Sequence, residues 1–190
     1  MISTYCGDII GLVKGDLIGA IVNPANHELA EGGTLCGEIY DHAGAADLKH
    51  DLHGVRGMSE GSAVITYGYH LSDWIIHTLA PRYDSEGKWE SLKMCYQSIL
   101  QMGAHLSGEA GVEAVAIPAI GTGAFGLDKD KADEIAYLTL SEAHEKPLGY
   151  DKVNFVLVFN EPHRYQQMLD KDGVADYTRR RMKKPTSTLP

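Results

Sequence analysis

The stretch V-E-A-V-A-I-P-A-I-G-T-G-A-F, residues 112 to 125, followed directly by Gly126, organises the rest of the chain. Its first half is an apolar run rich in valine, alanine and isoleucine, which is typical of a strand buried on both faces. Its second half is a turn containing Gly121, Gly123 and Gly126, and a helical pattern over residues 128–144 follows. Backbone N–H groups of such a turn converge on one spot beside a helix N-terminus. The stretch therefore predicts a phosphate site.

The glycines of this turn allow two other interpretations. Glycines after a strand can form a plain tight turn. Spelled G-T-G-A-F-G, the turn also fits the weak G-x-G-x-x-G dinucleotide pattern. That pattern opens the first βαβ unit and expects an acidic residue about 20 positions on at a strand end. Here Ser141 and Glu142 fall inside the predicted helix, and only one more strand-like run follows, so the phosphate interpretation stands without the dinucleotide fold.

The composition is that of an ordinary globular chain. Its 190 residues fit one domain, with 44% hydrophobic and 23% charged residues. A formal charge of −9 argues against a nucleic-acid surface. No apolar run reaches the length of a membrane span, and the N-terminus shows no signal segment. Cys6, Cys36 and Cys95 are odd in number and widely spaced, which favours reduced thiols and a cytoplasmic location.

Strand and helix patterns alternate along the chain. Strands are predicted at residues 2–6, 20–22, 61–66, 74–79, in the first half of the opening stretch, and at 153–159. Helices are predicted at residues 37–53, 90–106, 128–144 and from 162 onwards, with a turn at 14–16. This alternation indicates an α/β fold with a largely parallel sheet.

The end of the chain differs in composition. Residues 1–170 are expected to form the domain, and residues 171–190 a basic helix end and tail. The basic run from Arg179 to Lys184 suits a helix C-terminus that frays into a terminus. Contact of this run with nucleic acid or an acidic partner is the alternative.

Five features fall where predicted strands leave the sheet, the edge at which α/β proteins bind ligands. They are Asp8-Ile9, Asn23 to Asn26, Gly32-Gly33, Gly121 to Gly126, and Phe159-Asn160. Two glycine loops can hold two phosphates, and asparagine amides suit sugar hydroxyls. A carboxylate suits a purine amino group, and an aromatic ring stacks on a base. The set predicts a ligand with a diphosphate, a base and more than one sugar.

At this point the chain resembles the macrodomains, a family that binds ADP-ribose. The resemblance is carried by G-D-I (7–9), A-I-V-N-P-A-N (20–26), G-G-T-L-C-G-E-I (32–39), I-H-T-L-A-P-R-Y (76–83), P-A-I-G-T-G-A-F-G (118–126) and V-F-N (158–160). It covers about residues 2–170. It implies a three-layer α/β/α sandwich around a mixed, largely parallel sheet of six strands.

The resemblance also implies roles for residues. Asp8 takes the adenine amino group, Ile9 lines that pocket, and Phe159 lies on or beside the ring. The two glycine loops hold the phosphates, while Asn26 holds the distal ribose with Phe125 packed against it. The complete expected set of ligand-binding residues is Asp8, Ile9, Asn23, Asn26, Gly32, Gly33, Gly121, Thr122, Gly123, Ala124, Phe125, Gly126, Phe159 and Asn160.

The first glycine loop departs from hydrolytic members of that family. They usually read G-G-G-V-D-G-A-I, and the aspartate helps to place or activate a water near the distal ribose. Here Cys36 stands at the aspartate position, Thr34 at the third glycine, and Tyr40 where histidine is common. A thiol with a reference pKa of about 8.5 does not replace a carboxylate base near neutral pH. The candidate catalytic residues are Asn26 and, at the position of the family's aspartate, Cys36.

Two classes of function stay open. One is an enzyme that releases ADP-ribose from protein, nucleic acid or an acetyl ester, with Asn26 or a substrate phosphate orienting the water and Glu38 or Asp41 as alternative bases. The other is a non-catalytic module that reads or sequesters ADP-ribose. A weaker third possibility is nucleotide sensing, with the basic tail touching a partner. In each case the expected partner is ADP-ribose or an ADP-ribosylated protein.

Neither covalent catalysis nor metal chemistry is favoured by the sequence. Cys36 has no evident histidine partner that would make it a nucleophile. Cys36 with His42, and His50 with His53, are pairs without a third zinc ligand. No metal and no cofactor is expected. His77, inside a predicted buried strand, fits a hydrogen-bonded core histidine.

Overall fold

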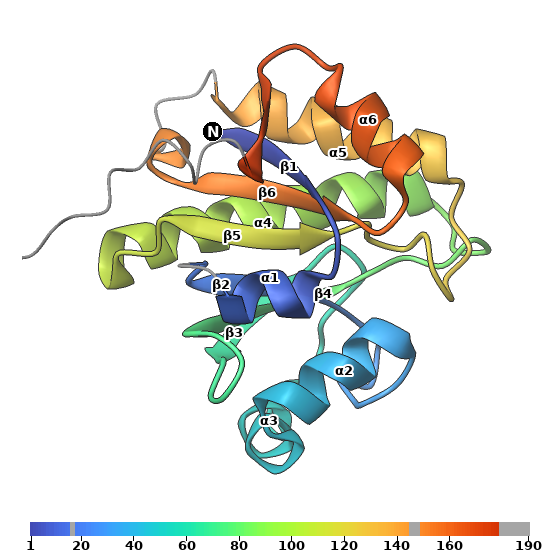
Figure 1. Ribbon diagram of the computed structural model, residues 1–190. Coiled ribbons are helices and arrows are strands. Elements are labelled where there is room, and N and C mark those ends of the chain that lie inside the picture. Colours follow the sequence, from blue (N-terminus) through green and yellow to red (C-terminus); the bar gives the residue numbers. More distant parts are fainter. Residues whose placement is uncertain (16–17, 145–148, 179–190) are drawn as a thin grey trace, which may run out of the picture.

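The computed structural model describes residues 1–15, 18–144 and 149–178. Within these ranges a seven-stranded sheet lies between two layers of helices (Figure 1). The strand order is β3-β4-β2-β5-β6-β1-β7. The pairing of β3 with β4 is antiparallel, and the other pairs of neighbouring strands are parallel. The strands are β1 (Ile2–Cys6), β2 (Ala20–Ala25), β3 (Ala63–Tyr67), β4 (Trp74–Leu79), β5 (Ala114–Pro118), β6 (Asn154–Phe159) and β7 (Val174–Asp176).

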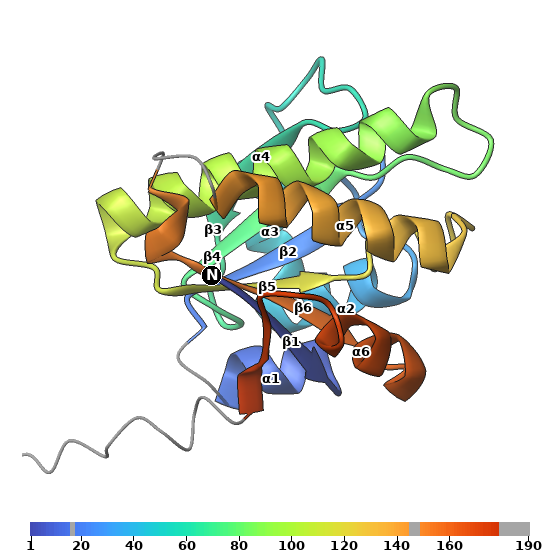
Figure 2. The ribbon, with the colours of Figure 1, turned by 90° about the horizontal axis from the view of Figure 1, so that it is seen from above.

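The helices divide between the two faces of the sheet. Helices α1 (Ile9–Gly15), α2 (Thr34–Ala43) and α3 (Ala45–Leu52) cover one face. Helices α4 (Lys88–Ala110), α5 (Lys129–His144) and α6 (Pro162–Leu169) cover the other, where α4 and α5 run side by side (Figure 2). A short 3-10 helix, η1 (Tyr150–Lys152), precedes β6.

Successive side chains along the central strands point to opposite faces of the sheet, so a separate core forms on each face. In β5, Val115 and Ile117 pack toward α4 and α5 together with Phe155 of β6. Ala114 and Ala116 pack toward the opposite helices together with Val156. All five residues of β5 are buried, as the continuous apolar run predicts. The three-layer α/β/α architecture with a mixed, largely parallel sheet is confirmed.

The sheet has one strand more than the predicted six. β7 pairs in parallel with β1, placing Val174 opposite Ile2. This edge strand has three half-buried residues, so no apolar run announces it in the sequence. It lies within residues 171–190, where a basic helix end is expected. The basic run from Arg179 lies outside the described residues.

Two helices also differ from the prediction. Residues 14 and 15 of the turn expected at 14–16 are the end of a helix, α1, which the sequence did not predict, and residue 16 lies outside the described residues. The single helix expected over residues 37–53 is two helices that meet at Gly44. Gly44 has φ 115°, a conformation that residues with a side chain rarely adopt, so the helix axis breaks there.

His77 of β4 is a fully buried core histidine, as predicted. The amide of Asn23 donates to its Nδ1 over 3.1 Å. Its Nε2–H then donates to Thr66 Oγ1 over 2.9 Å, and the Thr66 hydroxyl donates to the Tyr67 carbonyl. This chain of donors fixes a neutral imidazole inside the sheet.

We expect His77 to remain neutral at pH 5. Burial lowers its pKa from 6.5 to about 4. The unfolded chain therefore takes up a proton near pH 6.5, whereas the folded chain does so only near pH 4. The contribution of His77 to stability is complete above pH 6.5 and is lost as the pH falls toward 4. An NMR titration of the histidine side chains tests this, and a His77 signal that moves between pH 6 and 7 contradicts it.

Candidate functional site

Four neighbouring parallel strands end at the same edge of the sheet. The order β2-β5-β6-β1 brings together the segments that follow these strands. Asp8 follows β1, Asn26 follows β2, the loop from Ala119 follows β5, and Asn160 follows β6. This carboxyl-end edge carries all five features selected from the sequence.

Asp8 forms the N-terminus of α1. Its carboxylate is exposed and accepts the backbone N–H groups of Ile10 at 3.2 Å and Gly11 at 2.7 Å. Helix capping thus accounts for part of its role. A carboxylate offers about four acceptor sites, so capacity remains for a further donor. Ile9 is 7% exposed and belongs mainly to the core beneath this end of the sheet.

Asn26 organises the loop after β2. Its side chain donates to the Ala30 carbonyl at 2.9 Å and accepts the Ala30 N–H at 3.0 Å. A Cβ at Gly32 would lie 3.3 Å from Asn26 Nδ2, so the two predicted site residues are adjacent. Tyr40 of α2 donates to the Leu29 carbonyl at 2.7 Å and so ties the same loop to this helix. One amide proton and one acceptor site of Asn26 remain for a ligand.

Asn23 does not fit the predicted ligand contact. It is fully buried and bonded to His77, so its side chain serves the core. Its Oδ1 has no hydrogen-bond partner among the described residues.

Cys36 lies in the first turn of α2 and is 6% exposed. Its thiol donates to the Ala30 carbonyl at 3.6 Å. Burial raises the pKa of the Cys36 thiol, although Asn23 and the Gly32 backbone partly oppose the shift. The group is therefore a neutral thiol near pH 7, which is unsuited to act as a base or a nucleophile. Glu38 and Asp41 are exposed on α2, away from its buried face.

Helix α2 begins at the first glycine loop without a side-chain cap. Gly33, its N-cap residue, has φ 67° and is exposed. No acidic residue lies in the first turn of the helix. The N–H groups and the positive end of the helix dipole are thus available to an anion.

The loop after β5 closes on itself and leaves donors free. Gly126 N–H donates to the Gly123 carbonyl and Leu127 N–H to the Gly121 carbonyl, each over 3.0 Å. Gly121 has φ 75°, and a Cβ there would lie 2.5 Å from Leu127 Cδ1, so this position requires glycine. In the described part of the chain, the backbone N–H groups of Gly123, Ala124 and Phe125 have no acceptor. Three consecutive N–H groups are therefore available to an anion.

The end of β6 differs from the expectation for a base-stacking ring. Phe159 is 3% exposed and packs in the core under α5 and α6. The guanidinium carbon of Arg164 lies 5.1 Å from its ring centroid. Stacking on a base would require the ring to leave this position. Asn160, which follows, is exposed.

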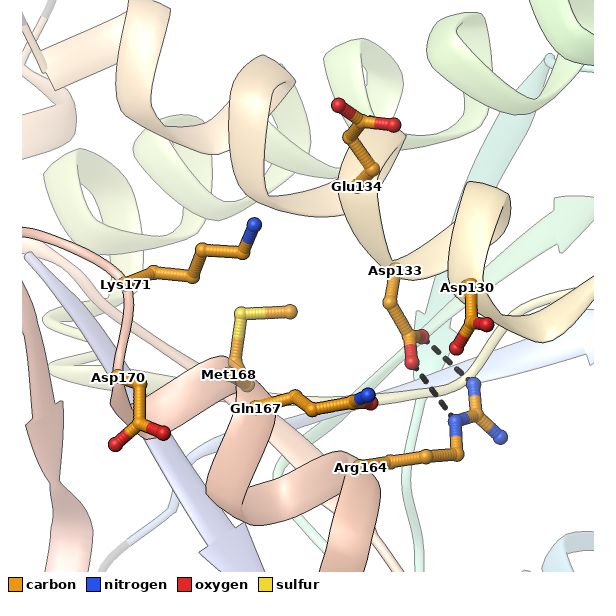
Figure 3. A pocket seen from close by; sticks show the side chains of 8 residues that line it. All are labelled: Asp130, Asp133, Glu134, Arg164, Gln167, Met168, Asp170 and Lys171. Carbon is orange, nitrogen blue, oxygen red and sulfur yellow. Dashed lines mark hydrogen bonds and ion pairs between the residues drawn. The ribbon is translucent and has the colours of Figure 1, made fainter.

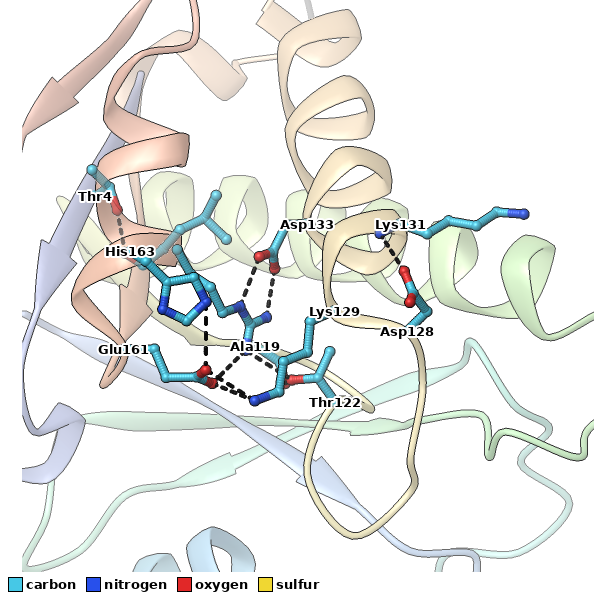
Figure 4. Close-up of polar contacts among 11 residues, drawn as sticks. Thr4, Ala119, Thr122, Asp128, Lys129, Lys131, Asp133, Glu161 and His163 are labelled. Carbon is cyan, nitrogen blue, oxygen red and sulfur yellow. Dashed lines mark hydrogen bonds and ion pairs between the residues drawn. The ribbon is translucent and has the colours of Figure 1, made fainter.

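A polar network behind the glycine loop was missed by the sequence reading. Arg164 of α6 binds Asp133 of α5, Glu161 and Thr122. Lys129 in turn binds Glu161 (Figure 4). The hydrogen bond from Arg164 Nη1 to Thr122 Oγ1 joins residues 42 positions apart, so only the fold brings them together. The signal in the sequence for this network was Arg164 itself, a basic residue in the first turn of the helix that follows β6.

A separate cavity of about 540 Å³ lies between α5 and α6 (Figure 3). Its wall includes Asp130, Asp133, Glu134, Asp170, Arg164 and Lys171. Among the described residues, no group of three His, Cys, Asp or Glu side chains could hold a metal ion. No described helix is long and apolar enough to cross a membrane.

Comparison with known proteins agrees with this fold. The Macro domain family matches residues 22–136, which is more than half of the sequence. A macro domain-containing protein of Methanosarcina mazei is 36% identical over 146 residues, 73% of this chain and 75% of that protein. The chain belongs to the Macro domain family.

Two solved structures of similar fold are complexes with ADPR or ADP-ribose. A variant of the Oceanobacillus iheyensis macrodomain with ADPR is 28% identical, with a TM-score of 0.72 over 87% of this chain and 90% of that one. The Trypanosoma brucei macrodomain in complex with ADP-ribose is 26% identical, with a TM-score of 0.72 over 88% and 67%.

Proposed function

We propose that this protein binds ADP-ribose at the carboxyl-end edge of its sheet. The observation that carries the proposal is the pair of donor sets there: the free N–H groups of residues 123–125 and the uncapped N-terminus of α2. Two such sets suit the two phosphates of a diphosphate. Relatives of the same fold that bind ADP-ribose support this choice of ligand.

The remaining residues at the edge suit the two ends of that ligand. The exposed carboxylate of Asp8 would accept the adenine amino group at one end. Asn26 and Phe125 would contact the distal ribose at the other. Asn160 is exposed beside the adenine end. An ADP-ribosylated protein would present the same group on a side chain, and it is the partner that we propose.

We further propose that the protein is a reader that binds ADP-ribose without efficient hydrolysis. A buried, neutral Cys36 thiol occupies the position expected for the water-orienting carboxylate. Both neighbouring carboxylates on α2, Glu38 and Asp41, are exposed on its outer side. The three cysteines are unpaired, which favours the reducing cytoplasm as its location.

Calorimetry with ADP-ribose tests the binding. We expect a dissociation constant in the micromolar range, which corresponds to a binding free energy of roughly −8 kcal/mol. Asp8→Asn keeps an α1 cap but removes the charge, so it should weaken ADP-ribose binding by ~1–3 kcal/mol. The analogue with hypoxanthine in place of adenine lacks the amino group, so Asp8→Asn should reduce the preference for adenine. Absence of heat and of a thermal shift at millimolar ADP-ribose would refute the function.

A further inference from the structure

A buried arginine stands directly behind the glycine loop. Arg164 is 3% exposed and forms a two-point ion pair with Asp133, with Nε–Oδ2 at 2.8 Å and Nη2–Oδ1 at 2.6 Å (Figure 3). Its Nη1 donates to Glu161 at 3.2 Å. Planar, two-point pairing fixes the guanidinium in one orientation. The pair with Asp133 therefore also fixes the direction in which Nη1 makes its second contact.

That contact reaches the glycine loop. Arg164 Nη1 donates to Thr122 Oγ1 at 3.4 Å, and the Thr122 hydroxyl donates to the Ala119 carbonyl at 3.0 Å. The hydroxyl thus accepts from α6 and donates to the start of its own loop. Thr122 immediately precedes the free N–H groups of residues 123–125. A shift of Thr122 would therefore turn those groups away from a phosphate.

Arg164 does not itself offer charge to a phosphate. Asp133 and Glu161 neutralise it, and Lys129 balances the second carboxylate at 2.8 Å. Four donor contacts to Asp133, Glu161 and Thr122 occupy its guanidinium, which solvent scarcely reaches. The same guanidinium packs over Phe159, so one side chain touches both the phosphate loop and the end of β6.

We propose that Arg164 is a positioning residue, which orients the loop at residues 122–126 through Thr122 and thereby sets the affinity for the diphosphate of the ligand. The inference rests on the proposed function. It assigns a part in ligand selection to Arg164, whose donors are occupied by Asp133, Glu161 and Thr122. A purely structural Arg164 would support folding but would not distinguish ligands with a diphosphate from ligands without one.

The test compares affinities for ADP-ribose and for adenosine, the latter by NMR titration. Thr122→Val keeps the side-chain shape and removes the hydroxyl, so ADP-ribose should bind about fivefold to tenfold more weakly. Adenosine affinity should not change. Thr122→Ser should restore most of the loss. Thr139→Val is the matched control, since Thr139 is a buried threonine of α5 outside this network, and it should leave ADP-ribose binding unaltered.

A paired variant examines Arg164 itself. Replacing Arg164 alone would leave Asp133 buried without a partner and endanger folding. Arg164→Met with Asp133→Leu removes both charges, and should weaken ADP-ribose binding at least as much as Thr122→Val. Adding Thr122→Val to this pair should cause little further loss, because the two changes break the same contact.

Three results overturn the inference. They are unchanged ADP-ribose affinity in folded Thr122→Val, an equal loss for adenosine, and fully additive losses in the combined variant. If the wild-type protein binds ADP-ribose but any of these results is found, the proposed function stands and the role of Arg164 falls. If the wild-type protein fails to bind, both fall.

Discussion

Gly123→Val is expected to weaken ADP-ribose binding on the order of 100-fold or more while the protein remains folded. Gly123 is exposed, and a Cβ there would meet no neighbouring atom within 4 Å. Its φ is not in the positive range, unlike that of Gly121 and Gly126. Valine therefore fits the backbone, but its branched side chain would occupy the space that a phosphate needs above the free N–H groups.

Calorimetry together with thermal unfolding checks this expectation. Gly108→Val is the matched control, because Gly108 is an exposed glycine of α4 whose surroundings are equally open. It should retain wild-type affinity. If Gly123→Val stays folded and binds ADP-ribose with unchanged affinity, the loop is a turn and the phosphates bind elsewhere.

The second large effect concerns turnover. Cys36→Asp should raise the hydrolysis of an ADP-ribosyl linkage by ~10²–10⁴-fold, the usual scale of general base assistance. The carboxylate would lie in the first turn of α2, where the helix dipole favours negative charge and no acidic residue is present. ADP-ribose affinity should fall far less than the rate rises, because the new carboxylate acts mainly on the water although it lies in the same helix turn as the phosphate donors.

Mass spectrometry of ADP-ribose released from an ADP-ribosylated protein measures this effect, and Cys36→Ala is its control. The alanine variant should match the slow wild-type rate. If it abolishes a robust wild-type activity, the thiol is catalytic and the reader proposal is wrong. If folded Cys36→Asp gains no activity, other groups place the water, and Asn26 is the next residue to vary.

Sequence reading succeeded where one short stretch contains all the needed information. Residues 112–126 predict a doubly buried strand and an anion-binding turn because the apolar run and the glycines are adjacent in the chain. It failed for α1, where Gly11 and Gly15 obscure a helix of buried Ile9, Ile10, Leu12 and Val13. Asp8 before that run was a usable N-cap signal.

Contacts between segments far apart in the chain could not be predicted from the sequence. Arg164 lies 31 residues from Asp133 and 42 from Thr122, so no local pattern joins them. Phe159 is an aromatic residue at the end of β6, as expected. Side chains alternate along β6, however, so Phe159 points to the same core as Phe155 and Leu157. Burial of Asn23 likewise follows from its pairing with His77 on the neighbouring strand.

The position of β1 has a consequence for how the chain is made. This first strand lies between β6 and β7, the last two strands, and Ile2 pairs with Phe155 and Val174. During synthesis β1 has no partner strand until almost the whole domain has left the ribosome. Asp8 and Asn160 therefore come together late, by a long-range closure of the sheet. A nascent chain that stops before β6 would have both glycine loops and Asp8, but it would lack the strand that holds β1 beside β5.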